Sequence, residues 1–575
     1  MTIVTFFIDN KVVVCFFIKL REPKILIMKI KTIKATEEAY QYPLLIKDLL
    51  ENALRVNPKH EIVYLDEVRM NYYELYDRIK QFCNLLSEIG LEGGSVVGMM
   101  DYDSHRYLEA FFAVPISANV LHTINWRLAP DQILYTINHA EDEILIVHED
   151  FLPIVEGFAD RLETVKKIIV IQEQLKSPVG TKLQIEGCYE TLLAKQSVEY
   201  EFPTFSEEAI ATLFYTTGTT GSPKAVFFSH RQLMLHTLVE MSTLSLMNEG
   251  FKINASDVYL PLTPMFHVHA WGMPYVATAL TLKQVYVGRF EPKRFIEIFI
   301  NEKPTISHCV PTILNMLLVS PQAQTIDLSS WRVLIGGSAL SRPLAQKAME
   351  RGISVVTGYG MSETCPLLTT SYLSLETVQA DLETQLDIRT LTGRAALLVD
   401  LKVVNEKGEN VPKDGKTLGE VVVRAPFLTM GYYKDPIRSK ELWAGGYMHT
   451  GDIAWMNAQG DIKIVDREKD VIKTGGEWMS SLRIEELIQA HPDVVDAAVV
   501  GIPDPKWGER PIALVITKDK KALSHQELSD HMMQFVDNNS LNKWAIPDQF
   551  IGVDEIPKTS VGKINKRLIR ELYSK

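Results

Sequence analysis

The sequence has few cysteines and no long run of apolar residues. Five cysteines occur among 575 residues, and none stands in a CxxC pair or at the spacing of a metal site. Reduced thiols are therefore expected, as in a cytoplasmic protein. No apolar run reaches the roughly 18 residues that a membrane-spanning helix needs, so at most peripheral contact with a membrane is expected.

The first residues lack the features of a targeting segment. They are apolar, but Asp9 and Lys11 interrupt them, and they have neither a leading basic region nor a small-residue cleavage site. Met28 begins a stretch that looks like an ordinary start, so residues 1–27 are expected to be an upstream extension, disordered or loosely attached. The N-terminal extension as a whole is expected over residues 1–34, before the large domain begins. The final ELYSK is not a peroxisomal address.

Basic residues are outnumbered by acidic ones. The chain has 60 Lys and Arg against 72 Asp and Glu, which gives a net charge of −12. This balance argues against a nucleic-acid partner. It leaves room for an anionic small ligand, because such a ligand needs positive charge only where it binds.

Length and periodicity predict an α/β fold with more than one domain. A chain of this length exceeds what one core supports. Apolar strands are expected over 143–150, 166–172 and 331–337, and they alternate with helical patterns such as the one over 341–351. This alternation is typical of βαβ units, which form a mostly parallel sheet with flanking helices.

The pattern changes toward the C-terminus. After about residue 395, short strands separated by turn residues predict a small β-rich subdomain. Past Asp466, two strands and one helix predict a small α+β unit. We therefore expect a large N-terminal domain over 35–466 and a mobile C-terminal domain over 467–575.

A loop rich in glycine and hydroxyl groups lies between two apolar runs in LFYTTGTTGSPKAVFFSH, residues 213–230. Its glycines, Gly218 and Gly221, let the backbone approach a ligand closely, and exposed amides in such a turn bind anions. The loop suits a polyphosphate, although its spacing is not that of the NTPase P-loop. The loop alone would also fit a flexible surface segment. Its hydroxyl groups and its charge come from Thr216, Thr217, Thr219, Thr220, Ser222 and Lys224.

Five further segments follow in chain order: GGSAL (336–340), TGYGMSET (357–364), YMHTGD (447–452), DREKDVIKTGGEW (466–478) and PKTSVGKINK (557–566). With the loop, they resemble the signature segments of the adenylate-forming superfamily, which includes acyl-CoA synthetases, luciferases and adenylation domains. The resemblance runs from about residue 40 to the C-terminus. It implies that a carboxylate attacks the α-phosphate of ATP and expels pyrophosphate. One departure is Ala225, where the family usually has glycine.

The resemblance implies catalytic roles for three side chains. Lys563 would lie between the carboxylate and the α-phosphate, and His267 would border the entry of the acid. Glu363 would help to hold Mg²⁺, with Thr216 as a second oxygen ligand. Taken alone, Lys563 could be a solvated lysine and Glu363 a helix cap.

The resemblance also implies a nucleotide site in which Asp452 accepts hydrogen bonds from the ribose. Lys469 would be the hinge about which the C-terminal domain rotates between the two half-reactions, with Gly475 and Gly476 beside the CoA channel. Locally, Lys469 and Lys473 are simply an i,i+4 pair of solvated side chains. The expected ATP- and AMP-binding residues are Thr216, Thr217, Gly218, Thr219, Thr220, Gly221, Lys224, Val268, Gly337, Thr357, Gly358, Tyr359, Ser362, Asp452, Arg467, Lys469, Lys473 and Trp478.

Two segments, 122–142 and PMFHVHAWGMPY (264–275), look like those of bacterial medium- and long-chain fatty acid–CoA ligases. Trp271 falls at the position of an indole that gates the fatty-acid tunnel in that branch, although a large aromatic can also be core. His267 and His269 would share a face in a strand and invite a metal site, but no third ligand is evident.

The expected substrates are therefore a fatty acid, ATP with Mg²⁺, and coenzyme A, and a homodimer is one option for the assembly. Three alternatives stay open. The acid could be aryl or short-chain, the acceptor could be a carrier protein, or the chain could be a non-catalytic nucleotide-binding homologue. Intact Lys563, Glu363, Asp452 and Arg467 argue against the last of these.

Overall fold

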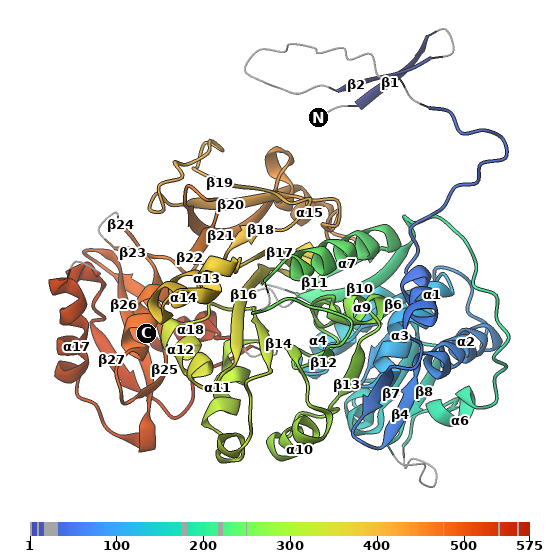
Figure 1. Cartoon of the computed structure of the whole chain (residues 1–575), viewed down its shortest axis with the longest axis horizontal. Helices are drawn as coiled ribbons and strands as arrows, with labels where there is room; N and C mark the ends of the chain where they lie inside the picture. The colour runs from blue at the N-terminus through green and yellow to red at the C-terminus, as the bar shows by residue number, and fades with distance from the viewer. Residues whose placement is uncertain are drawn as a thin grey trace.

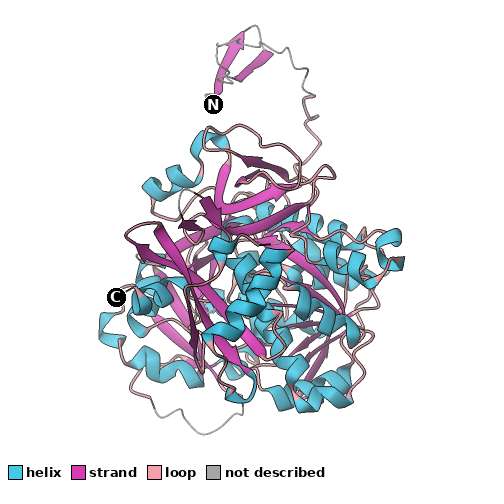
Figure 2. Cartoon of the chain, turned by 90° about the vertical axis from the view of Figure 1, so that its left-hand side faces the viewer, coloured by secondary structure: helices cyan, strands magenta, loops and turns pink. Residues whose placement is uncertain are grey.

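The computed structural model describes residues 3–8, 11–16, 31, 33–173, 181–216, 222–248, 250–474, 477–538, 541–559 and 563–574. Figure 1 shows a large body built from two sheets and their helices, with a smaller sheet above it and a C-terminal unit at one side. The hairpin of β1 (Ile3–Ile8) and β2 (Lys11–Phe16) lies apart from this body in both views (Figures 1 and 2).

The first large sheet has seven strands in the order β11-β10-β6-β5-β7-β8-β9. All neighbours are parallel except β10 and β11, which form an antiparallel pair at one edge. The predicted strands over 143–150 and 166–172 are β7 and β8 of this sheet. The strands are β5 (Val96–Met100), β6 (Val120–Thr123), β7 (Asp142–His148), β8 (Lys167–Ile171), β9 (Gly187–Cys188), β10 (Ile210–Thr216) and β11 (Lys224–Ser229).

The second large sheet has nine strands in the order β18-β17-β16-β15-β14-β12-β13-β3-β4. Its six central strands, from β16 to β3, are parallel, and the edge strands are antiparallel. The strands are β3 (Glu61–Tyr64), β4 (Val68–Asn71), β12 (Val258–Pro261), β13 (Lys283–Tyr286), β14 (Ile306–Cys309), β15 (Arg332–Ile335), β16 (Ser354–Gly360), β17 (Leu367–Thr370) and β18 (Arg394–Ala395).

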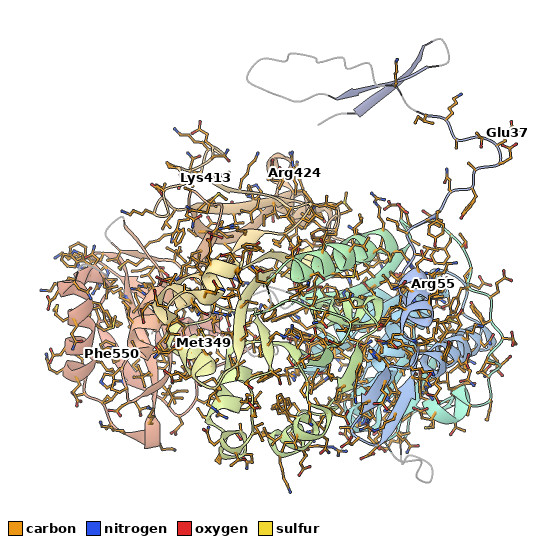
Figure 3. The ribbon with its side chains drawn as sticks, viewed as in Figure 1. Glu37, Arg55, Met349, Lys413, Arg424 and Phe550 are labelled. Atoms are coloured by element: carbon orange, nitrogen blue, oxygen red, sulfur yellow. The ribbon has the colours of Figure 1, made fainter. Side chains whose placement is uncertain are left out.

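Helices pack against both sheets, and one lies between them. All twelve residues of α3 (His105–Ile116) are buried, as expected for a helix without a solvent-facing side. It contacts β3 of the second sheet and β5, β6 and β10 of the first. Side chains fill the space between the layers (Figure 3).

Capping boxes at Asn71 and Ser229 begin two of the remaining helices of the large body. The predicted helix over 341–351 is α12. The remaining helices of the large body are α1 (Lys47–Val56), α2 (Tyr72–Glu88), α4 (Pro130–Ala140), α5 (Leu152–Glu156), α6 (Tyr189–Leu193), α7 (His230–Ser245), α8 (Val268–Trp271), α9 (Met273–Ala279), α10 (Pro292–Glu302), α11 (Pro311–Val319), α12 (Arg342–Glu350), α13 (Leu375–Gln379), α14 (Leu382–Arg389) and α15 (Pro436–Leu442).

A four-stranded antiparallel sheet follows the large body, at the place where a small β-rich subdomain is expected. Its order is β19-β20-β21-β22. The strands are β19 (Asp400–Val404), β20 (Gly419–Arg424), β21 (Met448–Met456) and β22 (Ile462–Arg467).

The C-terminal unit combines a five-stranded sheet with three helices and has its own apolar cores. Its main strands, β25 and β26, pair over nearly their whole length. The elements are β23 (Ile472–Thr474), β24 (Glu477–Met479), α16 (Ser481–Gln489), β25 (Val494–Asp504), β26 (Gly508–Thr517), α17 (His525–Asp537), β27 (Gln549–Gly552) and α18 (Lys566–Tyr573).

Candidate active site

A cavity of about 1570 Å³ lies between the large body and the C-terminal unit. Segments that follow the carboxyl ends of β6, β14 and β15 contribute Asn125, Pro311 and Gly336 to its wall, and the C-terminal unit contributes Lys469 and Lys563. Ligands of open α/β sheets bind outside the carboxyl ends of the strands, so the cavity lies where such a fold binds its substrate.

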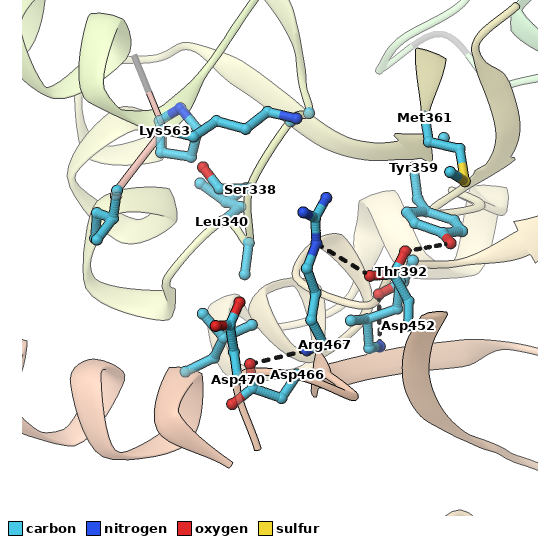
Figure 4. A pocket seen from close by; sticks show the side chains of 18 of the residues that line it. Ser338, Leu340, Tyr359, Met361, Thr392, Asp452, Asp466, Arg467, Asp470 and Lys563 are labelled. Carbon is cyan, nitrogen blue, oxygen red and sulfur yellow. Dashed lines mark hydrogen bonds and ion pairs between the residues drawn. The ribbon is translucent and has the colours of Figure 1, made fainter. Parts of the chain in front are cut away.

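Lys563 extends from the C-terminal unit into this cavity (Figure 4). Its Cε lies 3.2 Å from the position that a Cβ would take at Gly337, so the missing side chain there leaves room for the lysine. Burial and the neighbouring Arg467 lower the pKa of Lys563 to about 8, although Asp452 and Glu363 oppose the shift. Lys563 is thus a half-buried amine that lies among charged groups in the cavity.

Asp452 and Arg467 face each other on neighbouring strands, β21 and β22 (Figure 4). Arg467 Nε lies 3.4 Å from Asp452 Oδ1, and the hydroxyl of Tyr359 donates to Asp452 Oδ2 at 2.7 Å. Burial raises the pKa of Asp452, while Arg467 and Tyr359 act in the opposite direction. The carboxylate is therefore held in a fixed orientation at the cavity wall, where it can accept hydrogen bonds from a ligand.

Glu363 is buried and is held by a residue that the sequence motifs did not indicate. The hydroxyl of Tyr432 donates to Glu363 Oε1 at 2.7 Å and lies 3.5 Å from Lys224 Nζ. The chain near Tyr432 pairs with β11, where the amide of Tyr433 donates to the carbonyl of Ala225 at 2.9 Å. This long-range pairing brings Tyr432 to both side chains, and no local pattern signals it.

The donor chemistry around Glu363 fits Mg²⁺. A carboxylate can accept further contacts after one hydrogen bond, and Mg²⁺ prefers hard oxygen ligands. Thr216 supplies a hydroxyl from the end of β10 in the same cavity wall. Mg²⁺ typically takes one or two protein carboxylates, with phosphate oxygens and waters as its other ligands. Within the described ranges, no group of three or more His, Cys, Asp or Glu could hold a metal.

The hydroxyl- and glycine-rich loop connects β10 to β11, and the strand pairing brings Thr216 opposite Lys224. Both residues line the cavity. The predicted nucleotide contacts at Thr217, Gly218, Thr219, Thr220 and Gly221 lie outside the described residues.

The segment that holds His267 is not a strand, so its two histidines do not share the face that a strand would give them. Residues from Val268 to Trp271 all have positive φ, between 47° and 61°, a left-handed turn that is costly for side-chain-bearing residues. His267 lines the cavity, whereas His269 Nε2 is 2.8 Å from the hydroxyl of Thr212 inside the core. The two imidazoles therefore do not converge on one metal.

Burial and nearby positive charge keep His267 neutral. Its pKa falls to about 3, first because of burial and then because of Lys563 and Arg127. Backbone strain of the kind seen in the next turn is often concentrated at ligand sites. A neutral imidazole in this place can exchange hydrogen bonds with an acid without adding charge.

Trp271 also lines the cavity and is only 8% exposed. Its indole lies against the backbone of Gly336, where an added Cβ would come within 3.0 Å of Trp271 Cη2. On another side its ring centroid is 5.1 Å from that of His308. The indole is thus packed against Gly336 and His308 at the cavity wall.

Most of the other predicted nucleotide contacts lie in the same wall. Val268, Gly337, Thr357, Gly358, Ser362 and Lys469 all line the cavity. Lys473 lies on β23 with an exposed side chain and is not part of the lining. The predicted CoA contacts, Gly475 and Gly476, lie outside the described residues, as does the side chain of Trp478.

A buried polar chain joins the large body to the C-terminal unit beside Lys469. The amide and hydroxyl of Ser481 donate to Asp466 Oδ2 at 2.7 and 2.5 Å. Lys566 Nζ donates to the Ser481 hydroxyl at 2.5 Å and lies 2.8 Å from Glu485 Oε1. Sequence motifs did not indicate Ser481 or Glu485, because their roles depend on contacts between distant segments.

Comparison with known proteins places this site in a family. Residues 50–433 match the AMP-binding enzyme family, and residues 483–563 match the AMP-binding enzyme C-terminal domain. A long-chain-fatty-acid–CoA ligase from Thermus thermophilus is 39% identical, over 92% of this chain and 95% of its own length. A 3-methylmercaptopropionyl-CoA ligase from Ruegeria lacuscaerulensis is 34% identical, over 92% and 97%.

The fold is also that of a solved relative. The crystal structure of the anthranilate CoA ligase AuaEII in complex with anthranoyl-AMP superposes with a TM-score of 0.81, covers 92% of this chain and 98% of its own, and is 23% identical. This likeness confirms the predicted α/β fold with a small C-terminal domain. No helix within the described ranges has the length and apolarity to cross a membrane. On the match of residues 50–433, this chain belongs to the family of AMP-binding enzymes.

Proposed function

We propose that the chain is an AMP-forming acyl-CoA synthetase for medium- or long-chain fatty acids. In the first half-reaction, the fatty acid carboxylate attacks the α-phosphate of ATP and releases pyrophosphate. In the second, the thiol of CoA attacks the acyl-adenylate and releases AMP. The observation that carries the proposal is the convergence of Lys563, Asp452 and Glu363 on one cavity that also contains Trp271.

The obstacle in the first step is electrostatic, because an anion approaches a polyanion. Positioning and charge neutralisation are the means by which proteins promote such transfers. Lys563 supplies a positive charge at the cavity, and Arg467 supplies a second positive charge beside Asp452. In this proposal Lys563 neutralises charge between the two reacting groups, and Asp452 holds the ribose.

Mg²⁺, when bound, would neutralise phosphate charge, and Glu363 and Thr216 would hold it. Tyr432 orients Glu363 through its 2.7 Å hydrogen bond, and Lys224 lies beside the same hydroxyl. Neutral His267 would border the carboxylate of the acid, and the indole of Trp271 would border its chain. Burial of each methylene contributes about 0.8 kcal/mol, so an apolar tunnel holds a chain firmly but separates neighbouring lengths poorly.

We also propose that residues 467–575 move as a unit about Lys469. The position of Lys563 against Gly337 suits adenylate formation, and rotation would withdraw the lysine to let CoA enter. Gly475 and Gly476 would then lie beside the pantetheine chain.

The test is ATP–pyrophosphate exchange with acids from acetate to palmitate and with anthranilate as an aryl acid, followed by the same series with CoA. We expect exchange to peak at medium or long chains, and CoA to convert the adenylate to the thioester. Equal turnover of acetate and palmitate would contradict the tunnel. Highest exchange with anthranilate would show that the substrate is an aryl acid and not a fatty acid. An absence of exchange with every acid would refute the proposed ligase activity.

A further inference from the structure

Glu240 is a buried acidic residue that the adenylation chemistry does not use. It lies on α7, its side chain is 1% exposed, and it contributes to the cavity wall. Neither Oε1 nor Oε2 has a hydrogen-bond partner among the described residues. Buried polar groups in proteins are almost always paired, so this carboxyl requires an explanation.

The nearest polar group lies too far away to serve as its partner. His236 Nδ1 is 3.8 Å from Glu240 Oε2, beyond the length of a hydrogen bond. The other ring nitrogen, Nε2, accepts from the amide of Leu367 at 3.0 Å, which fixes the proton of the neutral ring on Nδ1. The Nδ1–H group of His236 and the carboxyl of Glu240 therefore face each other without forming a hydrogen bond, and a gap remains between them.

Gly272 keeps this gap open. A Cβ at that position would lie 3.0 Å from Glu240 Oε2 and 2.9 Å from His236 Nδ1. Gly272 directly follows Trp271, the residue expected at the acyl chain. Glu240 therefore lies at the part of the cavity assigned to the acyl group rather than at the nucleotide.

The state of the carboxyl indicates what kind of group could bind it. Burial raises the pKa of Glu240 well above its ordinary value, which favours the protonated carboxyl. A protonated carboxyl has one donor and one acceptor oxygen, which is the complement of a hydroxyl group. The purely apolar chain of an ordinary fatty acid offers neither of them a partner, whereas a hydroxyl group would pair with this carboxyl and gain a hydrogen bond on binding.

We propose that Glu240 is a selectivity residue that hydrogen-bonds a hydroxyl group on the acyl chain, so that the preferred substrates are hydroxylated fatty acids. This inference rests on the proposed function and specifies its substrate class. Glu240 would touch the substrate at a distance from the reacting carboxylate, and it would take no part in the chemical step.

The experiment compares decanoate with its monohydroxy derivatives, in which the hydroxyl is moved stepwise from near the carboxyl to the far end. For wild type, kcat/KM for pyrophosphate release should be about tenfold higher for one position of the hydroxyl than for decanoate, the size expected of one buried hydrogen bond. Glu240→Leu should reduce this ratio to one or below. Glu240→Gln, which keeps a donor and an acceptor in the same shape, should retain most of it.

Thermal unfolding separates this role from a structural one. Because Glu240→Leu replaces an unpaired buried carboxyl by an apolar group, we expect its Tm to rise relative to wild type. A lower Tm in both variants together with an unchanged substrate ratio would assign Glu240 to the core and overturn the proposal.

The substrate comparison has further outcomes. Equal use of decanoate and all its hydroxy derivatives by wild type would mean that water, rather than substrate, pairs with Glu240. Preference for an amino-substituted acid would mean that Glu240 binds as a carboxylate. Either result overturns the inference, yet exchange with decanoate itself would still support the fatty acid ligase, so the two failures are distinguishable.

Discussion

Raising the pH should switch off the first half-reaction by deprotonating Lys563. The pKa of this half-buried amine is about 8, because burial and Arg467 disfavour its charged form. At that pKa, about nine-tenths of the lysines are charged at pH 7 and about one-tenth at pH 9. If the charge is what the reaction needs, kcat/KM for pyrophosphate release should fall about tenfold between these pH values.

The variant Lys563→Ala tests the assignment of this titration. Loss of one group that stabilises the developing charge typically costs about 10²- to 10³-fold, and the alkaline fall should disappear along with the amine. Lys520→Ala is the matched control in the same unit, because the Lys520 side chain is 82% exposed and pairs with Asp554 at the surface. Such exposed pairs contribute little, so the control should keep both the rate and its pH dependence.

Two assays on the same variants complete the test. ATP–pyrophosphate exchange follows the first half-reaction, and thioester formation from supplied acyl-adenylate and CoA follows the second. We expect Lys563→Ala to lose the first and keep the second. An alkaline fall that persists in Lys563→Ala, or equal loss of both half-reactions, would refute the reasoning.

Three further substitutions test the surrounding contacts. Tyr432→Phe removes the hydroxyl that orients Glu363, so KM for ATP at limiting Mg²⁺ should rise about tenfold. An unchanged KM would show that this orientation of Glu363 does not matter for binding Mg²⁺. Asp452→Asn should weaken AMP binding, measured by calorimetry, by about tenfold or more. An affinity equal to that of wild type would contradict the proposed contact between Asp452 and the ribose. Ser481→Ala removes the hydroxyl that donates to Asp466, so it should slow pyrophosphate exchange about fivefold without slowing thioester formation from supplied adenylate. Equal effects on both half-reactions would show that the contact does not favour the domain orientation used for adenylation.

The local elements and the chemistry of the signature segments could be predicted from the order of the residues alone. The apolar run over 143–150 forms β7, and the helical pattern over 341–351 forms α12, because side-chain periodicity and capping act over a few residues. It also indicated Lys563 and Asp452, since their segments keep the residue types and spacing of the family. Both residues do line one cavity.

Contacts between groups that are far apart in the chain became evident only in the folded protein. Tyr432 reaches Glu363 through pairing with β11, and Glu240 lies beside Gly272, where an added Cβ would come within 3.0 Å of its Oε2. His267 and His269 part because the backbone after His267 turns left-handed, where a regular strand would have aligned them. Such outcomes depend on packing between segments far apart in the chain, and no local pattern of residues encodes the distances that packing creates.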